Sequence, residues 1–95
     1  MIIDDKDYGY HYPLKVLRSF EKKSKLNIFA LGDVSKLSAE NAGYLVYVGV
    51  KAWADREAEE FTYSFEEFLD LVSLSDVTEA MEHLLGSSEN GEKKS

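Results

Sequence analysis

Residues 38–53 read SAENAGYLVYVGVKAW, and the class of the whole chain depends on whether this stretch forms a helix or a strand. The residues from Leu45 to Val50 favour strands, and hydrophobic periodicity cannot separate a buried strand from a buried helix over so short a run. Length favours the helix, because the apolar stretch from Ala42 to Trp53 is longer than a usual strand. We therefore predict a helix from Ala39 to about Ala54, with Ser38 as its N-cap.

One face of this helix is predicted to lie in the core, and it carries Ala42, Leu45, Val46, Gly49 and Trp53. On this pattern we expect Trp53 to be buried against the first and the last helix of the domain. Gly43 and Gly49 each cost about 1 kcal/mol relative to Ala in a helix interior. Packing therefore has to outweigh helix propensity at these two positions.

The N-terminal residues predict a small β-hairpin. Residues 1–3 are apolar, residues 4–7 form a charged cluster rich in turn formers, and Tyr8, Tyr10 and Tyr12 then alternate with other residues. Alternation with period two places the three tyrosines on one face. Because an isolated hairpin is only marginally stable, we expect it to pack against the helices.

A first helix is predicted to begin at Pro13, because the fixed φ and missing N–H of proline cost nothing at the first helical position. This helix continues to Ser24, and its apolar arc consists of Leu14, Val16, Leu17 and Phe20. Residues 26–31 then form a single turn or an extended connection. Its apolar side chains are expected to fill the core, namely Ile28, Phe29 and Leu31.

Two short helices are predicted after the central one. Ser64 and Glu67 have the spacing of a capping box, which predicts a two-turn helix. Ser75 and Asp76 begin a last helix, with Asp76 and Glu79 as its cap, and Gly86 ends it. The predicted fold is mainly α. It is a single compact domain of about four helices with a short N-terminal β-hairpin over residues 1–86, followed by a disordered tail over residues 87–95.

The composition argues against several classes of function. The chain has 95 residues, a net charge of −7 and no Cys, so it holds one domain, opposes non-specific attraction to nucleic acid, and has neither disulfides nor thiolate metal sites. Its first residues lack the basic and apolar regions of a secretory signal. The longest uncharged run, residues 41–50, is about half of the roughly 20 residues that span a membrane. We expect a cytoplasmic protein.

The sequence contains no recognisable catalytic motif, and we predict no enzymatic activity, no cofactor and no metal. A calcium loop counted from Asp4 fails, because Lys6 and Lys15 stand where its third and twelfth positions need oxygen ligands. His11 and His83 lie far apart in the chain, with no second ligand cluster beside either of them.

The basic residues gather on one helix. Residues 15–25 carry five of the eleven basic side chains, whereas residues 55–82 carry ten acidic residues against Arg56 alone. One interpretation is a solvated basic face packed against the acidic half of its own chain. The other is contact between copies or with an acidic partner, because complementary patches steer association. For self-association the candidate residues are Lys15, Arg18, Lys22 and Lys25.

Tyr44 and Tyr47 share the polar side of the central helix with Glu40 and Lys51. Tyrosine is favoured where one end of a contact is dry and the other is wet. Either the hairpin covers this face, or the two tyrosines bind a partner.

These features together resemble a known family. An N-terminal hairpin precedes YPLKVLRSFEKK at residues 12–23, and an apolar central helix precedes FEEF at residues 65–68. The pattern resembles the tail assembly chaperones of long-tailed bacteriophages, which are often prophage genes. The likeness spans about residues 1–86 and rests on apolar and charged positions.

The resemblance implies a non-enzymatic, oligomeric protein of the bacterial host cytoplasm. Such a protein binds the long, largely helical tape-measure protein, keeps it soluble until the tail tube forms, and is absent from the mature virion. The family often makes a second, longer product by a late frameshift, and residues 87–95 would fit such a junction. The alternative is a small acidic adaptor or inhibitor, such as a prophage regulatory protein, that uses residues 55–82 to bind a basic surface of a host protein.

Overall fold

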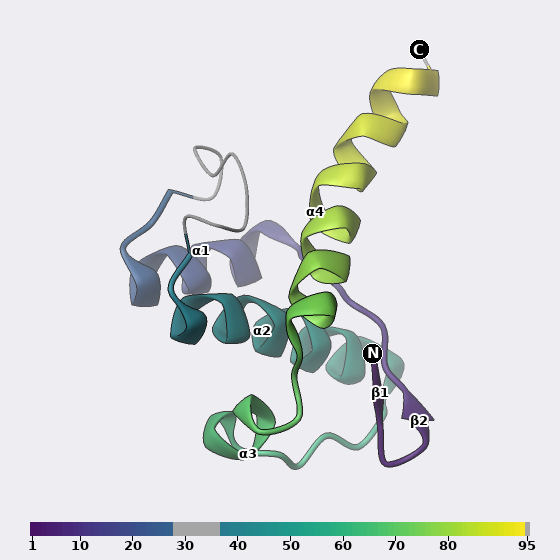
Figure 1. Ribbon diagram of the computed structural model, residues 1–95. Helices are drawn as coiled ribbons and strands as arrows, with labels where there is room; N and C mark the ends of the chain where they lie inside the picture. Colours follow the sequence, from purple (N-terminus) through teal and green to yellow (C-terminus); the bar gives the residue numbers. More distant parts are fainter. Residues whose placement is uncertain (28–36, 95) are drawn as a thin grey trace.

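A computed structural model describes residues 1–27 and 37–94 of the chain, and their side chains except those of residues 85–94 (Figure 1). Four helices and one hairpin make up this part. Their bounds are β1 Ile2–Ile3, β2 Lys6–Asp7, α1 Leu14–Ser24, α2 Ala39–Glu57, α3 Phe65–Leu69 and α4 Leu74–Lys94. The predicted class, mainly α with a short N-terminal hairpin, is confirmed.

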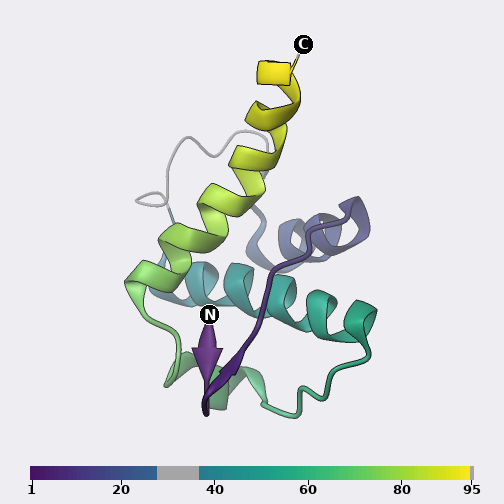
Figure 2. The same ribbon diagram turned by 90° about the vertical axis from the view of Figure 1, so that its right-hand side faces the viewer.

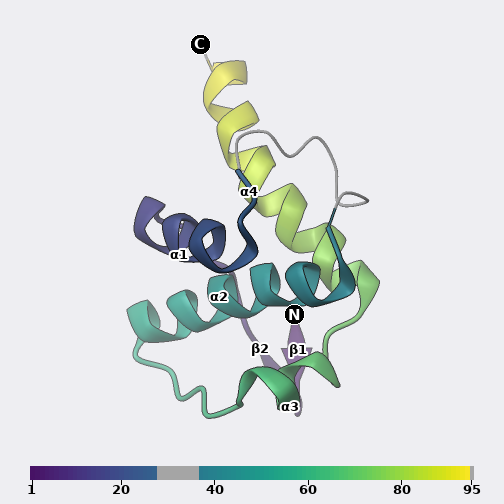
Figure 3. The same ribbon diagram turned by 90° about the vertical axis from the view of Figure 1, so that its left-hand side faces the viewer.

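Helix α2 is the centre of the fold. Helices α1 and α3 pack on opposite sides of it, and α4 crosses it (Figures 1 and 3). The predicted helical state of this stretch is confirmed, and so is its cap, since the Asn41 N–H donates to Ser38 Oγ at 3.1 Å. The helix ends three residues later than predicted, after Glu57, where Ala58 adopts a left-handed conformation with φ 57°.

The hairpin is shorter than the sequence predicted. Strands β1 and β2 are antiparallel, with Ile3 opposite Lys6. Asp4 and Asp5 form the two-residue turn at φ 52° and 66°, and positive φ at both positions suits a turn that follows the twist of the strands. The tyrosines therefore follow the second strand instead of forming it.

The segment that carries the tyrosines crosses α2 on its way to α1 (Figure 2). The His11 N–H donates to the main-chain oxygen of Gly49 at 3.0 Å, and the Tyr12 hydroxyl donates to that of Leu45 at 2.8 Å. Tyr8 and Tyr10 are buried. All three tyrosines thus turn inward, as their period-two spacing predicted, and they tie the N-terminal segment to the central helix.

Helix α1 ends at Ser24 as predicted, but Pro13 is its N-cap and not its first residue. Leu17 and Phe20 are buried, whereas Leu14 is 72% exposed. The assignment of Leu14 to the core was wrong. The reason is that Leu14 lies one turn before Arg18 on the outer face, because residues four apart share a face of a helix.

The capping box at Ser64 is confirmed. The Ser64 N–H donates to Glu67 Oε1 at 2.8 Å, and the Glu67 N–H donates to Ser64 Oγ at 3.2 Å. The predicted cap of α4 was wrong, because Ser73 occupies that position: its N–H donates to Asp76 Oδ2 at 3.0 Å, and its Oγ accepts from the Asp76 N–H at 3.4 Å.

The last helix is longer than predicted, because the prediction ended it at Gly86; the disordered tail expected over residues 87–95 stays a prediction. In the structure α4 stays helical to Lys94, and its last turns project away from the other helices (Figure 1).

Trp53 is half-buried, and the residues that pack against its ring are not the ones predicted. Its ring meets that of Tyr8 edge to face at a centroid distance of 5.9 Å. Gly9 lies against the indole, where any side chain would collide with it. The segment after the hairpin therefore covers Trp53, in place of the two helices that were expected. The predicted core residues Ile28, Phe29 and Leu31 lie outside the described residues.

Candidate functional site

Tyr44 and Tyr47 lie one turn apart on α2, both half-buried, with ring centroids separated by 6.3 Å. The Tyr44 ring lies between two helices: it stacks on Phe20 of α1 at 6.3 Å and meets Phe65 of α3 edge to face at 5.4 Å. The two alternatives for this face were cover by the hairpin or a free interface. In the structure α1 and α3 cover it in part.

Tyr47 is held by the α3 side of the molecule. Its ring lies 5.4 Å from both Phe65 and Phe68, and its hydroxyl donates to the main-chain oxygen of Tyr63 at 3.4 Å. Aromatic contacts of this kind contribute about 0.5–1.5 kcal/mol each beyond area burial. The two rings are therefore fixed in place, while part of each remains open to solvent.

A shallow groove of about 240 Å³ runs between α1 and α2 beside these rings. Its lining residues are Val16, Ser19, Tyr44, Tyr47, Val48, Lys51, Ala52 and Asp55. The lining residues on α2 recur at intervals of three and four residues, which is the spacing of one face of a helix. They extend over three turns, or about 16 Å at 1.5 Å per residue. Helix α1 thus covers only part of the side of α2 that faces it. We call the uncovered part, with its lining residues, the tyrosine groove.

The tyrosine groove has a lining of mixed polarity, in which Val16, Val48 and Ala52 are apolar and Lys51 and Asp55 are charged. Lys51 Nζ lies 5.9 Å from the centre of the Tyr47 ring, and Lys23 Nζ lies 5.2 Å from that of Tyr44. Asp55 lies at the far end of the same stripe. Because charges of both signs flank the groove, its electrostatics favour neither a strongly acidic nor a strongly basic occupant.

Of the four residues predicted for self-association, Lys15, Arg18 and Lys22 lie on α1, and Lys25 is the left-handed residue that ends it. Lys15, Arg18, Lys22 and Lys25 are all exposed. None of them pairs with a carboxylate within residues 1–27 and 37–84. Helix α1 packs on α2. Within the residues just named, no ion pair joins the basic residues of α1 to the acidic residues 55–82, as the interpretation of a basic face packed against its own acidic half would require.

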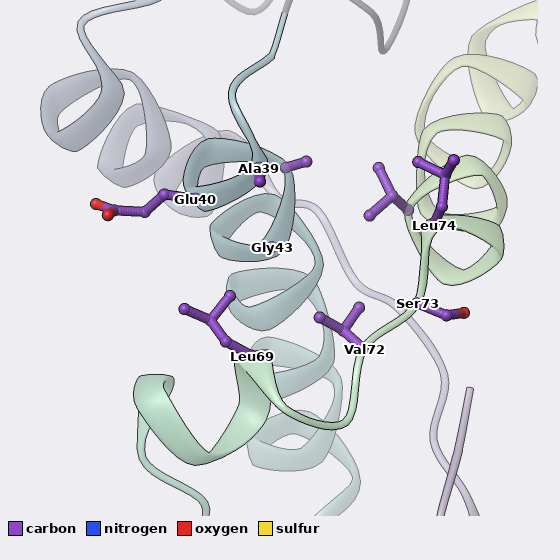
Figure 4. Close-up of a pocket in the computed structure, with 9 residues that line it drawn as sticks. Ala39, Glu40, Gly43, Leu69, Val72, Ser73 and Leu74 are labelled. Atoms are coloured by element: carbon purple, nitrogen blue, oxygen red, sulfur yellow. The ribbon is translucent and has the colours of Figure 1, made fainter.

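A second hollow was missed by the sequence analysis. A cleft of about 410 Å³ opens between the start of α2, α3 and the start of α4, and we call it the leucine cleft (Figure 4). Its lining residues are Ala39, Glu40, Ala42, Gly43, Leu69, Val72, Ser73, Leu74 and Val77. A signal was present in the sequence, because Leu71 and Leu74 belong to neither helical stripe; in the structure they are 44% and 74% exposed.

Polar side chains also meet in one place that the sequence did not suggest. His11 and His83 line one pocket of about 380 Å³ together with Arg56, although they are far apart in the chain. Arg56 Nη1 donates to His11 Nδ1 at 3.2 Å. Across the described side chains, no group of three or more His, Cys, Asp or Glu residues is placed to hold a metal ion.

The tyrosines of the N-terminal segment have perturbed acidities. Burial raises the pKa of Tyr12, and burial together with the hydrogen bond to the Glu79 carboxylate raises the pKa of Tyr10. The hydrogen bond from Tyr63 to the Asp4 carboxylate raises the pKa of Tyr63 to about 12. Each shift favours the neutral phenol, which suits hydrogen-bond donors that stabilise the fold.

Comparison with protein-family models, curated proteins and solved structures gave no match for this chain. Among the helices in the described part, none combines the length and the apolar character needed to cross a bilayer.

Proposed function

We propose that this protein is a tail assembly chaperone of a long-tailed bacteriophage or prophage. It binds the tape-measure protein without enzymatic turnover and keeps it soluble in the bacterial cytoplasm during tail assembly, and it is absent from the finished virion. The tyrosine groove supports this proposal most directly. The resemblance of residues 12–23 and 65–68 to that family agrees with it.

The groove has the form that receives a helix. Its α2 residues follow a spacing of three and four over three turns, and amphipathic helices dock in apolar grooves through anchors with the same spacing. The rings of Tyr44 and Tyr47 supply large contact area, and their packing against Phe65 lowers the entropy cost of ordering them on binding.

One groove of this size binds weakly, and the proposed function requires no more than that. A long tape-measure helix offers many similar apolar stripes, so several copies of the chaperone bind side by side. Each bound segment raises the effective concentration of its neighbours, and overall affinity then grows with the number of contacts. Recognition is expected to tolerate sequence differences along the partner.

The test is co-expression with the adjacent long tape-measure gene, with the soluble fraction of that protein as the measurement. The wild type is expected to raise the soluble fraction and to co-purify with the tape-measure protein. Ala52→Glu places a charge on the half-buried floor of the groove and is expected to abolish both effects. Thr78→Glu introduces the same charge at an exposed position of α4 and should behave as wild type.

Tyr44→Ser and Tyr47→Ser are less informative variants, because they also remove the contacts with Phe65 that hold α3. Circular dichroism and a thermal melt of Ala52→Glu establish whether the domain remains folded. Absence of any solubility gain with folded wild-type protein would contradict the chaperone proposal. Co-purification with a basic host protein instead would favour the acidic adaptor.

A further inference from the structure

Two exposed apolar features lie on different faces of this domain. Leu14 is 72% exposed at the start of α1, and Leu74 is 74% exposed at the edge of the leucine cleft. Large apolar side chains that stand exposed beside a hollow or a charged stripe mark interaction sites more often than isolated ones do. The chemistry around these two features is complementary.

The face around Leu14 is an apolar anchor with cations beside it. Arg18 and Lys22 follow Leu14 at intervals of four residues and so lie on the same side of α1, and Lys15 flanks them. All of these residues are exposed. Val16 and Ser19, which line the tyrosine groove, lie on a different side of the helix. Occupation of the Leu14 face therefore leaves the groove free.

The leucine cleft has the opposite character. Side chains of Leu69, Val72 and Leu74 form its walls (Figure 4), and Gly43 on its floor carries no side chain. Among the described residues that line it, only Glu40 is charged, and its carboxylate points away from the leucine side chains in Figure 4. Glu66 on α3 and Asp70 in the following turn are exposed close by in sequence. Within the described part of the chain, none of these three carboxylates forms an ion pair.

A single copy cannot join these two faces. The start of α1 lies beside the second half of α2, where Val16 and Ser19 share a groove with Ala52 and Asp55. The leucine cleft lies at the other end of α2, beside Ala39 and Gly43. An apolar anchor flanked by cations and an apolar cleft flanked by carboxylates can therefore meet only between molecules.

We propose that copies of this protein associate head to tail, with Leu14 of one copy seated in the leucine cleft of the next. The Leu14 side chain packs between Leu69, Val72 and Leu74. Arg18 and Lys15 then face the carboxylates of Glu40 and Asp70. Because the two surfaces differ, the contact is heterologous and generates open chains or rings instead of closed dimers. Each copy in such a chain still presents its tyrosine groove, although self-association does not depend on what that groove binds.

The test measures molar mass by light scattering and sedimentation over a range of protein concentrations. Wild-type protein is expected to form species larger than dimers as its concentration rises. These species should shrink at about 1 M salt, where the Debye length falls to about 3 Å. Leu14→Asp and Leu74→Asp each remove one of the two surfaces, at positions exposed enough to leave the fold intact, and each alone should be monomeric.

A mixture of these two variants gives the sharpest result. Leu14→Asp keeps an intact cleft and Leu74→Asp keeps an intact Leu14, so the mixture should form a one-to-one dimer that grows no further. An isologous interface would give no such complementation. Ile2→Asp makes the same kind of change at an apolar residue that is 71% exposed and belongs to neither surface, and it should assemble as wild type.

The charged contacts have their own test. Arg18→Glu and Glu40→Lys should each weaken assembly, and the double variant should recover it, because the pair is then reversed and not removed. Wild-type protein that remains monomeric at all concentrations, or Leu14→Asp protein that still assembles, would overturn the proposal. Neither result bears on the tyrosine groove, whose solubility assay is separate.

Discussion

The ring of Tyr12 lies against the bare Cα of Gly49, in the space that a side chain at residue 49 would fill. The Tyr12 hydroxyl donates to the main-chain oxygen of Leu45, one turn earlier on α2. The neighbouring His11 N–H donates to the main-chain oxygen of Gly49 itself. Gly49 is thus the point at which the N-terminal segment fastens onto the central helix.

Gly49→Ala should destabilise the domain, although Ala is the better helix former by about 1 kcal/mol. The new methyl group would collide with the Tyr12 ring, and overpacking of this kind typically costs about 1–3 kcal/mol. We expect the collision to outweigh the propensity gain, which chemical denaturation by urea would measure. Gly43→Ala is the control: its nearest neighbour is the end of the flexible Leu69 side chain, which can move aside. Equal losses for both variants would contradict this explanation.

Phe68→Ala should be more damaging than Trp53→Ala. Phe68 is fully buried and packs against Tyr47 and Phe61, and truncation of a buried Phe costs about 3–5 kcal/mol. Trp53 is half-buried against Tyr8 and should cost less. Thermal melts of both variants show which one loses more stability. A larger loss for Trp53→Ala would place the main core near the end of α2.

Ser64→Ala should cost about 1 kcal/mol, the usual loss when an N-cap hydroxyl is removed. The effect reaches beyond the five residues of α3, because that helix holds Phe65 against Tyr44. Unfolding by denaturant measures the loss. Thr62→Ala, at an exposed position just before the cap, should change stability by only a few tenths of a kcal/mol.

Stability should fall in alkaline solution, and Tyr63 should contribute to the fall. The hydrogen bond to Asp4 raises its pKa from 10.0 to about 12. Between these values the folded protein retains a proton that the unfolded chain has lost. The contribution of Tyr63 is therefore complete below pH 10.0 and disappears as the pH rises through about 12. Unfolding free energies measured against pH should decline less steeply in this window for Tyr63→Phe than for wild type. Identical slopes would show that the bond is absent in solution.

Local signals in the sequence account for most of the helices. Ser38 and Ser64 cap α2 and α3 as predicted, because an N-cap needs only a hydroxyl and the next three residues. The placing of Tyr44 and Tyr47 together on one face of α2 also followed from helical spacing alone.

Long-range packing explains what the sequence did not reveal. The leucine cleft exists because α3 and α4 approach the same end of α2, and no local pattern encodes that approach. Leu14 looked like a core residue by hydrophobicity, and only the position of α2 decides which side of α1 is buried. The hairpin boundary depended on left-handed conformations at Asp4 and Asp5, which are uncommon for residues other than glycine.

The hydrogen bond from the Tyr10 hydroxyl to Glu79, at 2.9 Å, joins residues 69 positions apart in the chain. On the ribosome Tyr10 is made long before Glu79, so the N-terminal tyrosines leave the exit tunnel with no helix yet available to cover them. Contacts of such high sequence separation form late, because loop closure precedes any gain from the contact. The earliest residues to be synthesised should therefore be among the last to reach their final positions, and ribosome-bound chains that stop before α4 should leave Tyr10 accessible to solvent.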